Sequence, residues 1–315
     1  MRCLSIRSEG KLVVDERADP TPSSFEVLVA IKAAGLNAAD LLQRRGFYPA
    51  PAGSPADIPG LEFAGEVVSI GAGVDGFTAG DRVMAVVGGG GQATHIVAPA
   101  PTLLRVPPNV TWAEAGGFPE AFTTAHDALF TQCGLGMGER VCIHGAAGGV
   151  GSAAVQIARG AGAHVTATVR DEARHDDVRA LGADVVMTPE EFVATNGYDV
   201  ILELVGAPNM EHNVAALNTG GRISVIGVGA GGQATINLLG LMQKRGAIFA
   251  STLRARPIAA KADAARRVEQ HLIPLLADGR IRVPVLESFA LDEAEAAYER
   301  FAAGGKLGKI VLTTA

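Results

Sequence analysis

The segment that most constrains the fold is Arg140–Gln156, which reads RVCIHGAAGGVGSAAVQ. Its residues 141–143 form a short apolar run that is typical of a buried strand. A glycine-rich turn follows at residues 145–151, and a helical pattern continues from there to residue 161. The order of strand, glycine-rich turn and helix predicts the first βα unit of a doubly wound parallel sheet.

The small residues of this turn have distinct physical tasks. Ala146 and Gly148 allow a tight turn and let backbone N–H groups approach a pyrophosphate, while Gly151 lets the helix pack closely on the strand. The phosphates then lie at the positive end of the helix dipole. A purely structural turn is the alternative, but the flanking strand and helix favour dinucleotide binding. The predicted phosphate-binding residues are Ala146, Ala147, Gly148, Gly149, Val150 and Gly151.

The element pattern divides the chain into two domains. In residues 118–254, apolar strands alternate with helices, as in a parallel sheet that is covered on both faces. The strands are predicted at 141–145, 164–169, 184–187, 199–205, 222–228 and 247–252, and the helices at 151–161, 171–181, 209–217 and 236–244. Residues 1–117 contain short strands with many glycine and proline turns, which indicates an irregular β-barrel. The segment 255–315 is expected to return to this barrel domain.

Besides its strands, the barrel domain is predicted to contain three helices and one long loop. Its strands are predicted at Phe25–Ile31, Gly60–Ile70, Arg82–Val87, Gln92–Val97, 283–289 and 309–312, and further helices at 258–278 and 291–303. The helix at residues 37–45 begins at Asn37, a residue type that caps helices. The loop at 46–59 contains Phe47 and Tyr48. Because a loop of this length is uncommon unless it is functional, it is a candidate wall of a substrate site.

Composition excludes several functional classes. The net charge is −6, so no basic surface is expected to bind nucleic acid or an anionic membrane. No segment reaches the roughly 20 apolar residues that a membrane span needs, and the N-terminus lacks a signal-peptide pattern. We therefore expect a cytoplasmic enzyme. The three cysteines form no C-x-x-C pair, and Cys142 is expected to be a small core residue.

The glycine-rich turn, NAADLLQRRGFYP at 37–49, GLEFAGEV at 60–67 and PEAFTTA at 119–125 together resemble the medium-chain dehydrogenase/reductase superfamily. More closely, the sequence resembles its zinc-free quinone oxidoreductases, over essentially the whole chain. The resemblance includes TLRARP at 252–257 and the final GKIVL. It implies a GroES-like domain (1–117 and 255–315), a Rossmann domain (118–254), and NADPH-dependent hydride transfer to a quinone or another α,β-unsaturated carbonyl.

The resemblance also implies that no metal is bound. Zinc-containing members have a cysteine where this chain has Asn37, and a histidine before a glutamate where it has Leu61 before Glu62. Asparagine and leucine cannot supply the thiolate and imidazole ligands that zinc prefers. Three cysteines cannot build the four-cysteine structural site either.

Polar side chains are expected to take the place of the metal near the nicotinamide. Asn37, Asp40 and Tyr48 lie at the family's matching positions and are the predicted catalytic residues. The alternative for Asn37 is a helix cap, and for Asp40 a solvated helix carboxylate. Tyr48 offers a ring to stack on a substrate and a donor to a carbonyl that is being reduced. Leu41-Leu42 stands where bacterial members often carry Thr-Tyr, so the natural acceptor stays open.

The end of the second Rossmann strand decides between NAD and NADP. An acidic residue there would hold the ribose 2′-hydroxyl, and an arginine the 2′-phosphate. Arg170 and Arg174 lie where related family members place a small residue and a lysine, so NADPH is the predicted cofactor. Asp171 and Glu172 are acidic residues at the same place, and the alternative to a role in binding the ribose is that they are helix-start carboxylates favoured by the dipole. The further cofactor-binding residues that the resemblance implies are Thr123, His126, Gly227, Val228, Gly229, Ser251, Thr252, Leu253 and Lys309.

Two alternative functions stay open. Enoyl-thioester reductases share this fold and turn, and a non-catalytic NADPH-binding or RNA-binding protein is the alternative from another class. The net negative charge and the lack of basic aromatic patches disfavour RNA binding.

The apolar run at 247–252 lies at one end of the predicted sheet, where an unprotected edge strand is able to pair with a strand of another chain. The resemblance implies a twofold homodimer joined at this edge.

Overall fold

The computed structural model describes residues 1–314, which form two compact units. The first unit combines Met1–Thr123, Leu253–Gly304 and the residues from Lys309 onward. The second unit combines Thr124–Thr252 and Gly305–Gly308. Within residues 1–314, no helix has the length and apolar character needed to cross a membrane.

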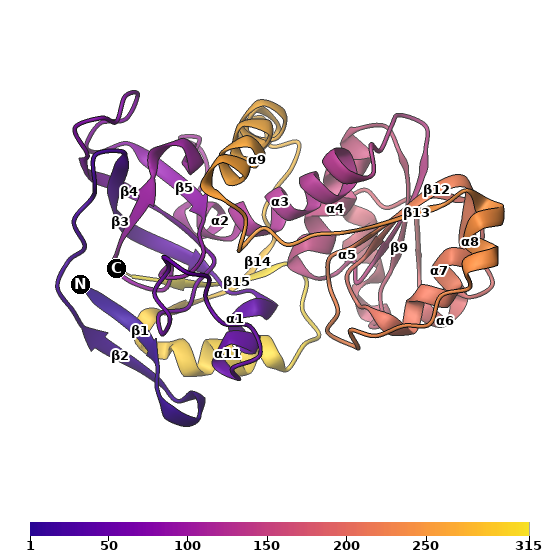
Figure 1. The fold of residues 1–315 in the computed structure, drawn as a ribbon, viewed down its shortest axis with the longest axis horizontal. Helices are drawn as coiled ribbons and strands as arrows, with labels where there is room; N and C mark the ends of the chain where they lie inside the picture. The colour runs from indigo at the N-terminus through magenta and orange to yellow at the C-terminus, as the bar shows by residue number, and fades with distance from the viewer. Residues whose placement is uncertain (315) are drawn as a thin grey trace. The chain divides into compact units, whose positions relative to one another are not determined.

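The first unit is built on a seven-stranded, mostly antiparallel sheet (Figure 1). The strand order is β14-β15-β3-β4-β5-β7, and β6 also pairs with β3. The strands are β3 (Glu26–Gly35), β4 (Glu62–Ile70), β5 (Arg82–Val86), β6 (His95–Pro99), β7 (Leu104–Arg105), β14 (Val285–Ala290) and β15 (Lys309–Thr313). The C-terminal strand β15 therefore lies antiparallel beside β3, and the return of the chain to the first unit is observed.

Alternation along β3 explains the core of this unit. Val27, Val29 and Ile31 point to one side and are at most 2% exposed, as a half-buried strand requires. A separate hairpin, β1 (Arg2–Ile6) and β2 (Leu12–Glu16), was not predicted from the sequence. The helices are α1 (Ala38–Arg44), α2 (Trp112–Gly117), α3 (Pro119–His126), α9 (Ile258–His271), α10 (Ile273–Ala277) and α11 (Ala294–Ala302). Helix α3 continues past the unit boundary as a π-helical turn, Asp127–Gln132.

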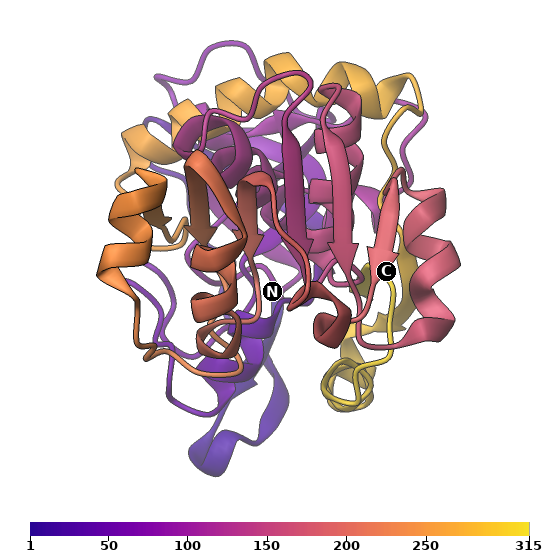
Figure 2. The same cartoon turned by 90° about the vertical axis from the view of Figure 1, so that its right-hand side faces the viewer.

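The second unit is a six-stranded parallel sheet with helices on both sides (Figure 2). The strands are β8 (Arg140–His144), β9 (His164–Thr168), β10 (Val185–Met187), β11 (Tyr198–Glu203), β12 (Leu217–Val225) and β13 (Ala247–Ala250). The helices are α4 (Gly149–Gly160), α5 (His175–Ala180), α6 (Pro189–Phe192), α7 (Met210–Ala216) and α8 (Leu238–Lys244). The order β10-β9-β8-β11-β12-β13 is the doubly wound order of dinucleotide-binding folds. The predicted fold class is confirmed.

Some element bounds differ from the prediction. Strand β12 begins at Leu217 instead of residue 222, because the chain enters the sheet directly after α7. The helix predicted at 171–181 is split into a 3-10 turn, Glu172–Arg174, and α5, because the Asp171 side chain accepts the Ala173 N–H and starts a separate turn.

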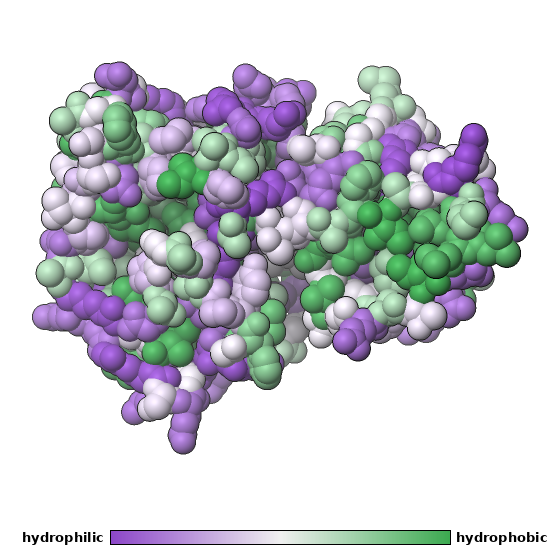
Figure 3. Space-filling model, in the orientation of Figure 1, coloured by the Kyte–Doolittle hydropathy of each residue, from purple (hydrophilic) through white to green (hydrophobic). Residues whose placement is uncertain are grey.

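Strand β13 is the edge of this sheet, and apolar side chains are exposed around it. Figure 3 shows a hydrophobic area over α8 and β13. Its exposed members are Val228, Leu238, Leu239, Met242 and Phe249. An apolar edge strand with a free row of backbone groups is a template for pairing with another strand.

We propose that a second copy of the chain covers this edge, by twofold pairing of β13 with its counterpart. Phe249→Lys is expected to convert the dimer to a monomer, because it puts a charge into the pairing edge. Val185→Lys is the control, since Val185 is exposed on β10 at the opposite edge of the same sheet. Light scattering at micromolar concentration measures both, and a monomeric wild type would contradict the proposal.

Candidate functional site

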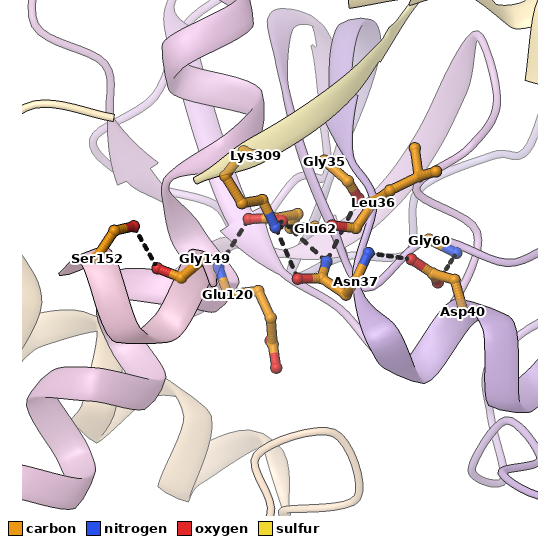
Figure 4. A network of polar contacts seen from close by, with 10 residues as sticks. All are labelled: Gly35, Leu36, Asn37, Asp40, Gly60, Glu62, Glu120, Gly149, Ser152 and Lys309. Carbon is orange, nitrogen blue, oxygen red and sulfur yellow. Dashed lines mark hydrogen bonds and ion pairs between the residues drawn. The ribbon is translucent and has the colours of Figure 1, made fainter. Parts of the chain in front are cut away.

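A buried polar network surrounds the start of α1 in the first unit (Figure 4). Lys309 on β15 is 3% exposed, and its Nζ donates to Glu62 Oε1 at 2.6 Å and to Asn37 Oδ1 at 2.7 Å. The third acceptor is the Leu36 carbonyl at 3.0 Å. An ammonium has three donors, so each donor of Lys309 already has an acceptor in this unit. The role of Lys309 in cofactor binding stays a prediction.

Glu62 on β4 is the centre of this network and is fully buried. Besides Lys309, its Oε1 accepts from Asn37 Nδ2 at 2.9 Å, and its Oε2 accepts the Glu120 N–H at 2.8 Å. Gly35 makes room for the carboxylate, since a Cβ there would lie 2.3 Å from Glu62 Oε1. Sequence reasoning did not select Glu62, although an acidic residue among the apolar residues of LEFA at 61–64 was a usable signal.

The structure brings Asn37 and Asp40 together at the start of α1. Asn37 occupies the N-cap position, but its amide is directed to Lys309 and Glu62, and this fixes which end of the amide carries oxygen. The Asp40 carboxylate accepts the backbone N–H groups of Asn37 at 2.8 Å and Gly60 at 3.0 Å.

Asp40 is not the solvated helix carboxylate that was the alternative for it, because its side chain is fully buried. The reason is the capping geometry, which turns the carboxylate inward to the Asn37 and Gly60 N–H groups. Burial raises the pKa of Asp40 to about 6, and the two N–H donors oppose this rise. A carboxyl with this pKa exchanges protons close to neutral pH.

Tyr48 lies in the loop between α1 and β4. Its backbone carbonyl accepts a hydrogen bond from Arg254, which is not a member of the polar network around Glu62. Its side chain is partly buried, and burial raises the pKa of the phenol above its ordinary value of 10. The Arg254 guanidinium lies over the ring, with Cζ 5.0 Å from the ring centroid, and it opposes that rise. The phenol is therefore protonated at neutral pH and able to donate a hydrogen bond.

The glycine-rich turn of the second unit lies between β8 and α4, as predicted. The positive φ of the turn falls at Gly145 (65°), whereas Gly148 has a φ of −71°. The left-handed backbone conformation of the turn is therefore adopted by Gly145, which the sequence analysis did not single out, and the phosphate-binding role of Ala146 and Gly148 stays a prediction. Gly151 is required for another reason, since a Cβ there would lie 2.4 Å from the Gly145 carbonyl oxygen.

The observed turn fits a pyrophosphate. The N–H groups in the first turn of any α-helix lack intrahelical acceptors, and α4 begins at Gly149 without a side-chain cap on them. The helix is 12 residues long, so its dipole favours an anion at this end. The turn also contains no side chain larger than Val150, which lets an anion approach the backbone.

A second polar network lies beneath this turn. Glu203, at the end of β11, is fully buried and accepts the N–H groups of Val205 at 2.6 Å and Gly206 at 2.8 Å. Asn213 donates to Glu203 at 2.7 Å, and its Oδ1 lies 2.8 Å from His144 Nε2. Burial lowers the pKa of His144, which is therefore neutral. This network fixes the ends of the strands that lead into the predicted cofactor loops.

The loops after β11 and β12 lie against each other at the same edge of this sheet. A Cβ on Gly227 would lie 2.3 Å from the Leu204 carbonyl oxygen, and one on Gly206 would lie 2.9 Å from Val228 Cα. Gly206 and Gly227 thus lie at a close backbone crossing where only glycine leaves room, whereas a Cβ on Gly229 would meet no atom within 4 Å.

The two predicted cofactor-selecting arginines follow β9. Arg170 is exposed, and Arg174 Nη1 pairs with Asp177 Oδ2 at 3.1 Å. The Arg174 Nε is buried and lacks a hydrogen-bond partner among residues 1–314. A buried donor without an acceptor is costly, and an anionic oxygen would satisfy it.

The remaining predicted cofactor residues lie in both units. Thr123 and Leu253 belong to the first unit and are buried. His126 is buried in the second unit, and Ser251 and Thr252 follow β13. Within residues 1–314, no group of three or more His, Cys, Asp or Glu side chains is arranged to hold a metal ion.

Comparison with known proteins gives two family matches. Residues 23–108 match the alcohol dehydrogenase GroES-like domain, and residues 149–270 match the zinc-binding dehydrogenase family. The chloroplastic quinone-oxidoreductase QR1 of Triphysaria versicolor is 32% identical, over 93% of this chain and 91% of that protein. A crystal structure of a probable oxidoreductase from Mycobacterium abscessus is 31% identical, with a TM-score of 0.85 over 100% of this chain and 99% of that chain.

Polyketide synthases are also similar to this chain. A phenolphthiocerol/phthiocerol polyketide synthase protein of Mycobacterium tuberculosis is 33% identical over 93% of this chain. The chain spans only 14% of the length of that protein.

The fold, the glycine-rich turn and these matches define an oxidoreductase of the class that binds NAD(P). The chain belongs to the medium-chain dehydrogenase/reductase superfamily, in its quinone oxidoreductase-like group.

The buried ion pair of the first unit is expected to be essential for stability. Lys309→Met leaves the Glu62 carboxylate buried without its cation and should cost about 3–5 kcal/mol of unfolding free energy. Lys32→Met is the control, because Lys32 forms an exposed pair with Glu66 at 3.4 Å and should change stability by less than about 1 kcal/mol. Urea denaturation measures both, and equal losses would contradict the assignment.

Proposed function

We propose that this protein is a zinc-independent, NADPH-dependent reductase of quinones or other α,β-unsaturated carbonyls. One observation carries the proposal. In zinc-containing members a cysteine ligand stands at the position of Asn37, but here the Asn37 amide is tied to Lys309 and Glu62. The Lys309 ammonium neutralises Glu62, so the carboxylate has its cation without a metal.

A site that has hydrogen-bond donors but no metal ion favours activated acceptors. Without a Lewis acid, a carbonyl must be polarised by hydrogen bonds alone, and these stabilise the charge on a conjugated acceptor better than that on a simple alkoxide. NADPH, when bound, supplies the hydride. The Tyr48 phenol holds a proton at Oη for the acceptor oxygen, since burial keeps its pKa high. Asp40, with a pKa of about 6, is a second group able to hold a proton.

The preference for NADPH is supported by the residues after β9. Arg170 and Arg174 bring two guanidinium groups to this loop, and the buried Arg174 Nε lacks an acceptor among residues 1–314. Asp171 accepts the Ala173 N–H at 3.2 Å, which fits its interpretation as a helix-start carboxylate rather than a ligand of the ribose. The 2′-phosphate would supply the acceptors that the two arginines need.

Enoyl-thioester reduction is the second candidate. It is favoured by the similarity to the mycobacterial polyketide synthase protein, which covers 93% of this chain. An enoyl thioester is also a conjugated acceptor, so the same donors serve it. Turnover of NADPH with crotonyl-CoA beside a panel of quinones and enones separates the two candidates, and no turnover with either class would favour a non-catalytic NADPH-binding protein.

The first expected outcome concerns the reaction. The protein should oxidise NADPH with ortho- or para-quinones or conjugated enones, and Tyr48→Phe should lower kcat by about 10²-fold with NADPH affinity preserved. Tyr198→Phe is the control, since Tyr198 is buried in the second unit and donates to Thr195. An unchanged rate would assign Tyr48 to packing, and efficient ethanol oxidation would contradict the proposed function.

The second expected outcome concerns the cofactor. Arg170→Ala should weaken NADPH binding roughly ten- to a hundredfold and leave NADH binding nearly unchanged, because only NADPH carries the 2′-phosphate. Arg179→Ala is the control, since Arg179 pairs on α5 with Asp176. Fluorescence titration measures the affinities. Equal losses for both cofactors would refute the assignment of the 2′-phosphate.

A further inference from the structure

Arg254 is a buried cation in the first unit that the proposed chemistry does not use. It is 2% exposed, and its guanidinium donates from Nε to the Gly88 carbonyl at 2.8 Å and from Nη1 to the Tyr48 carbonyl at 2.8 Å. The Nη2 group donates to Gln43 Oε1. The three acceptors are neutral, so the bonds direct the geometry of the guanidinium without cancelling its charge.

These bonds join Arg254 to three segments that lie more than 160 residues before it in the sequence. Gln43 lies on α1, Tyr48 in the loop at 46–59, and Gly88 after β5. Gln43 also donates from Nε2 to the Ala56 carbonyl at 3.1 Å. Arg254 therefore holds the loop at Tyr48, and Gln43 holds it at Ala56. Arg254 and Gln43 are themselves joined by a hydrogen bond, so the two attachments are coupled.

The segment after β5 has the shape that this arrangement requires. A Cβ on Gly88 would lie 2.2 Å from Ser54 Oγ and 2.9 Å from Pro51 Cγ. The loop at 46–59 therefore packs directly on the Gly88 backbone, whose carbonyl holds the Arg254 Nε.

Arg254 also places a positive charge over the phenol of Tyr48, with Cζ 5.0 Å from the ring centroid. An arginine stays protonated even when it is buried. The other charged groups that act on these two side chains are Asp40 on α1, Glu120 on α3 and Lys261 on α9. The cation favours the deprotonated phenol, so it makes Tyr48 a better proton donor.

We propose that Arg254 is a positioning residue for Tyr48: its guanidinium fixes the loop at 46–59 through the Tyr48 carbonyl and orients the phenol by stacking on its ring. This inference rests on the proposed function for the role of Tyr48 in turnover. A lysine cannot replace Arg254, because a single ammonium lacks the planar fork that reaches three acceptors and stacks on a ring.

The chain offers a matched control in Arg82. Its guanidinium donates to the carbonyls of Pro107, Pro108 and Val110, and its Cζ lies 4.2 Å from the ring centroid of Trp112. Arg82 thus makes the same kind of contacts as Arg254, but it holds a different loop of the same unit.

Hydrogen–deuterium exchange of the full chain tests the positioning directly. Arg254→Gln should speed exchange in peptides that cover residues 46–59 about tenfold or more, with residues 107–111 unchanged. Arg82→Gln should speed exchange at residues 107–111 and leave residues 46–59 unchanged. Unchanged exchange at 46–59 in Arg254→Gln would overturn the proposal, and this readout does not depend on any catalytic activity.

Kinetics of NADPH oxidation with 9,10-phenanthrenequinone test the link to Tyr48. Arg254→Gln should lower kcat about tenfold or more with NADPH affinity changed less than twofold, and Arg254→Lys should give most of the same loss while keeping the fold. In a Tyr48→Phe background the Arg254→Gln loss should nearly vanish, because both changes remove one function. Full additivity of the two losses would overturn the proposal.

The two proposals fail in different ways. If the wild type turns over no quinone, enone or enoyl thioester, the proposed function fails, while the exchange experiment still decides whether Arg254 positions the loop. If the wild type is active but Arg254→Gln keeps both its loop protection and its kcat, only the inference on Arg254 fails.

Discussion

The buried ion pair between Lys309 and Glu62 is the interaction on which the first unit depends. It joins β15 to β4, and the second oxygen of Glu62 holds the first turn of α3 through the Glu120 N–H. Its partners also orient the Asn37 amide and thereby the start of α1. Because a buried charge without its partner is strongly destabilising, these elements form one cooperative arrangement. The proposed absence of zinc is then a property of this arrangement, in which the Lys309 ammonium supplies the positive charge that a metal ion would otherwise supply.

The second unit stabilises its buried carboxylate without any cation. Glu203 accepts two backbone N–H groups and the Asn213 amide, and charge-assisted bonds of this kind are the strong ones. His144 stays neutral beside it and reaches Thr168 Oγ1 at 2.9 Å with its other ring nitrogen. The ends of β8, β9 and β11 are thus held by dipoles alone. Helix α4 has no acidic residue in its first turn and no side-chain cap, so its positive end is uncompensated and favours an anion.

Much of the fold could be predicted from the sequence, because the six apolar strands of the second unit recur at regular distances and the turn after β8 is distinctive. The β1–β2 hairpin could not, since Ser5 is buried there and interrupts any simple alternation. Asn37 and Tyr48 could be selected as candidates because their residue types have local tasks, and their catalytic roles stay predictions. Arg254 and its acceptors Gly88, Tyr48 and Gln43 are separated by 166 to 211 residues, and no local pattern reports contacts of that separation.

The place of β15 in the first sheet has a consequence for the order of folding during synthesis. Strand β3 pairs with β15, so the sheet needs residues from both ends of the chain. The second unit is nearly contiguous, and all its strands precede β14 and β15 in the chain, so they are translated first. Until residue 309 is translated, Glu62 lacks its cation and residues 33–35 of β3 lack their partner strand, whereas residues 26–30 of β3 pair with β6. The second unit can therefore form while the first unit is still incomplete, and the sheet of the first unit is completed only when β15 is translated.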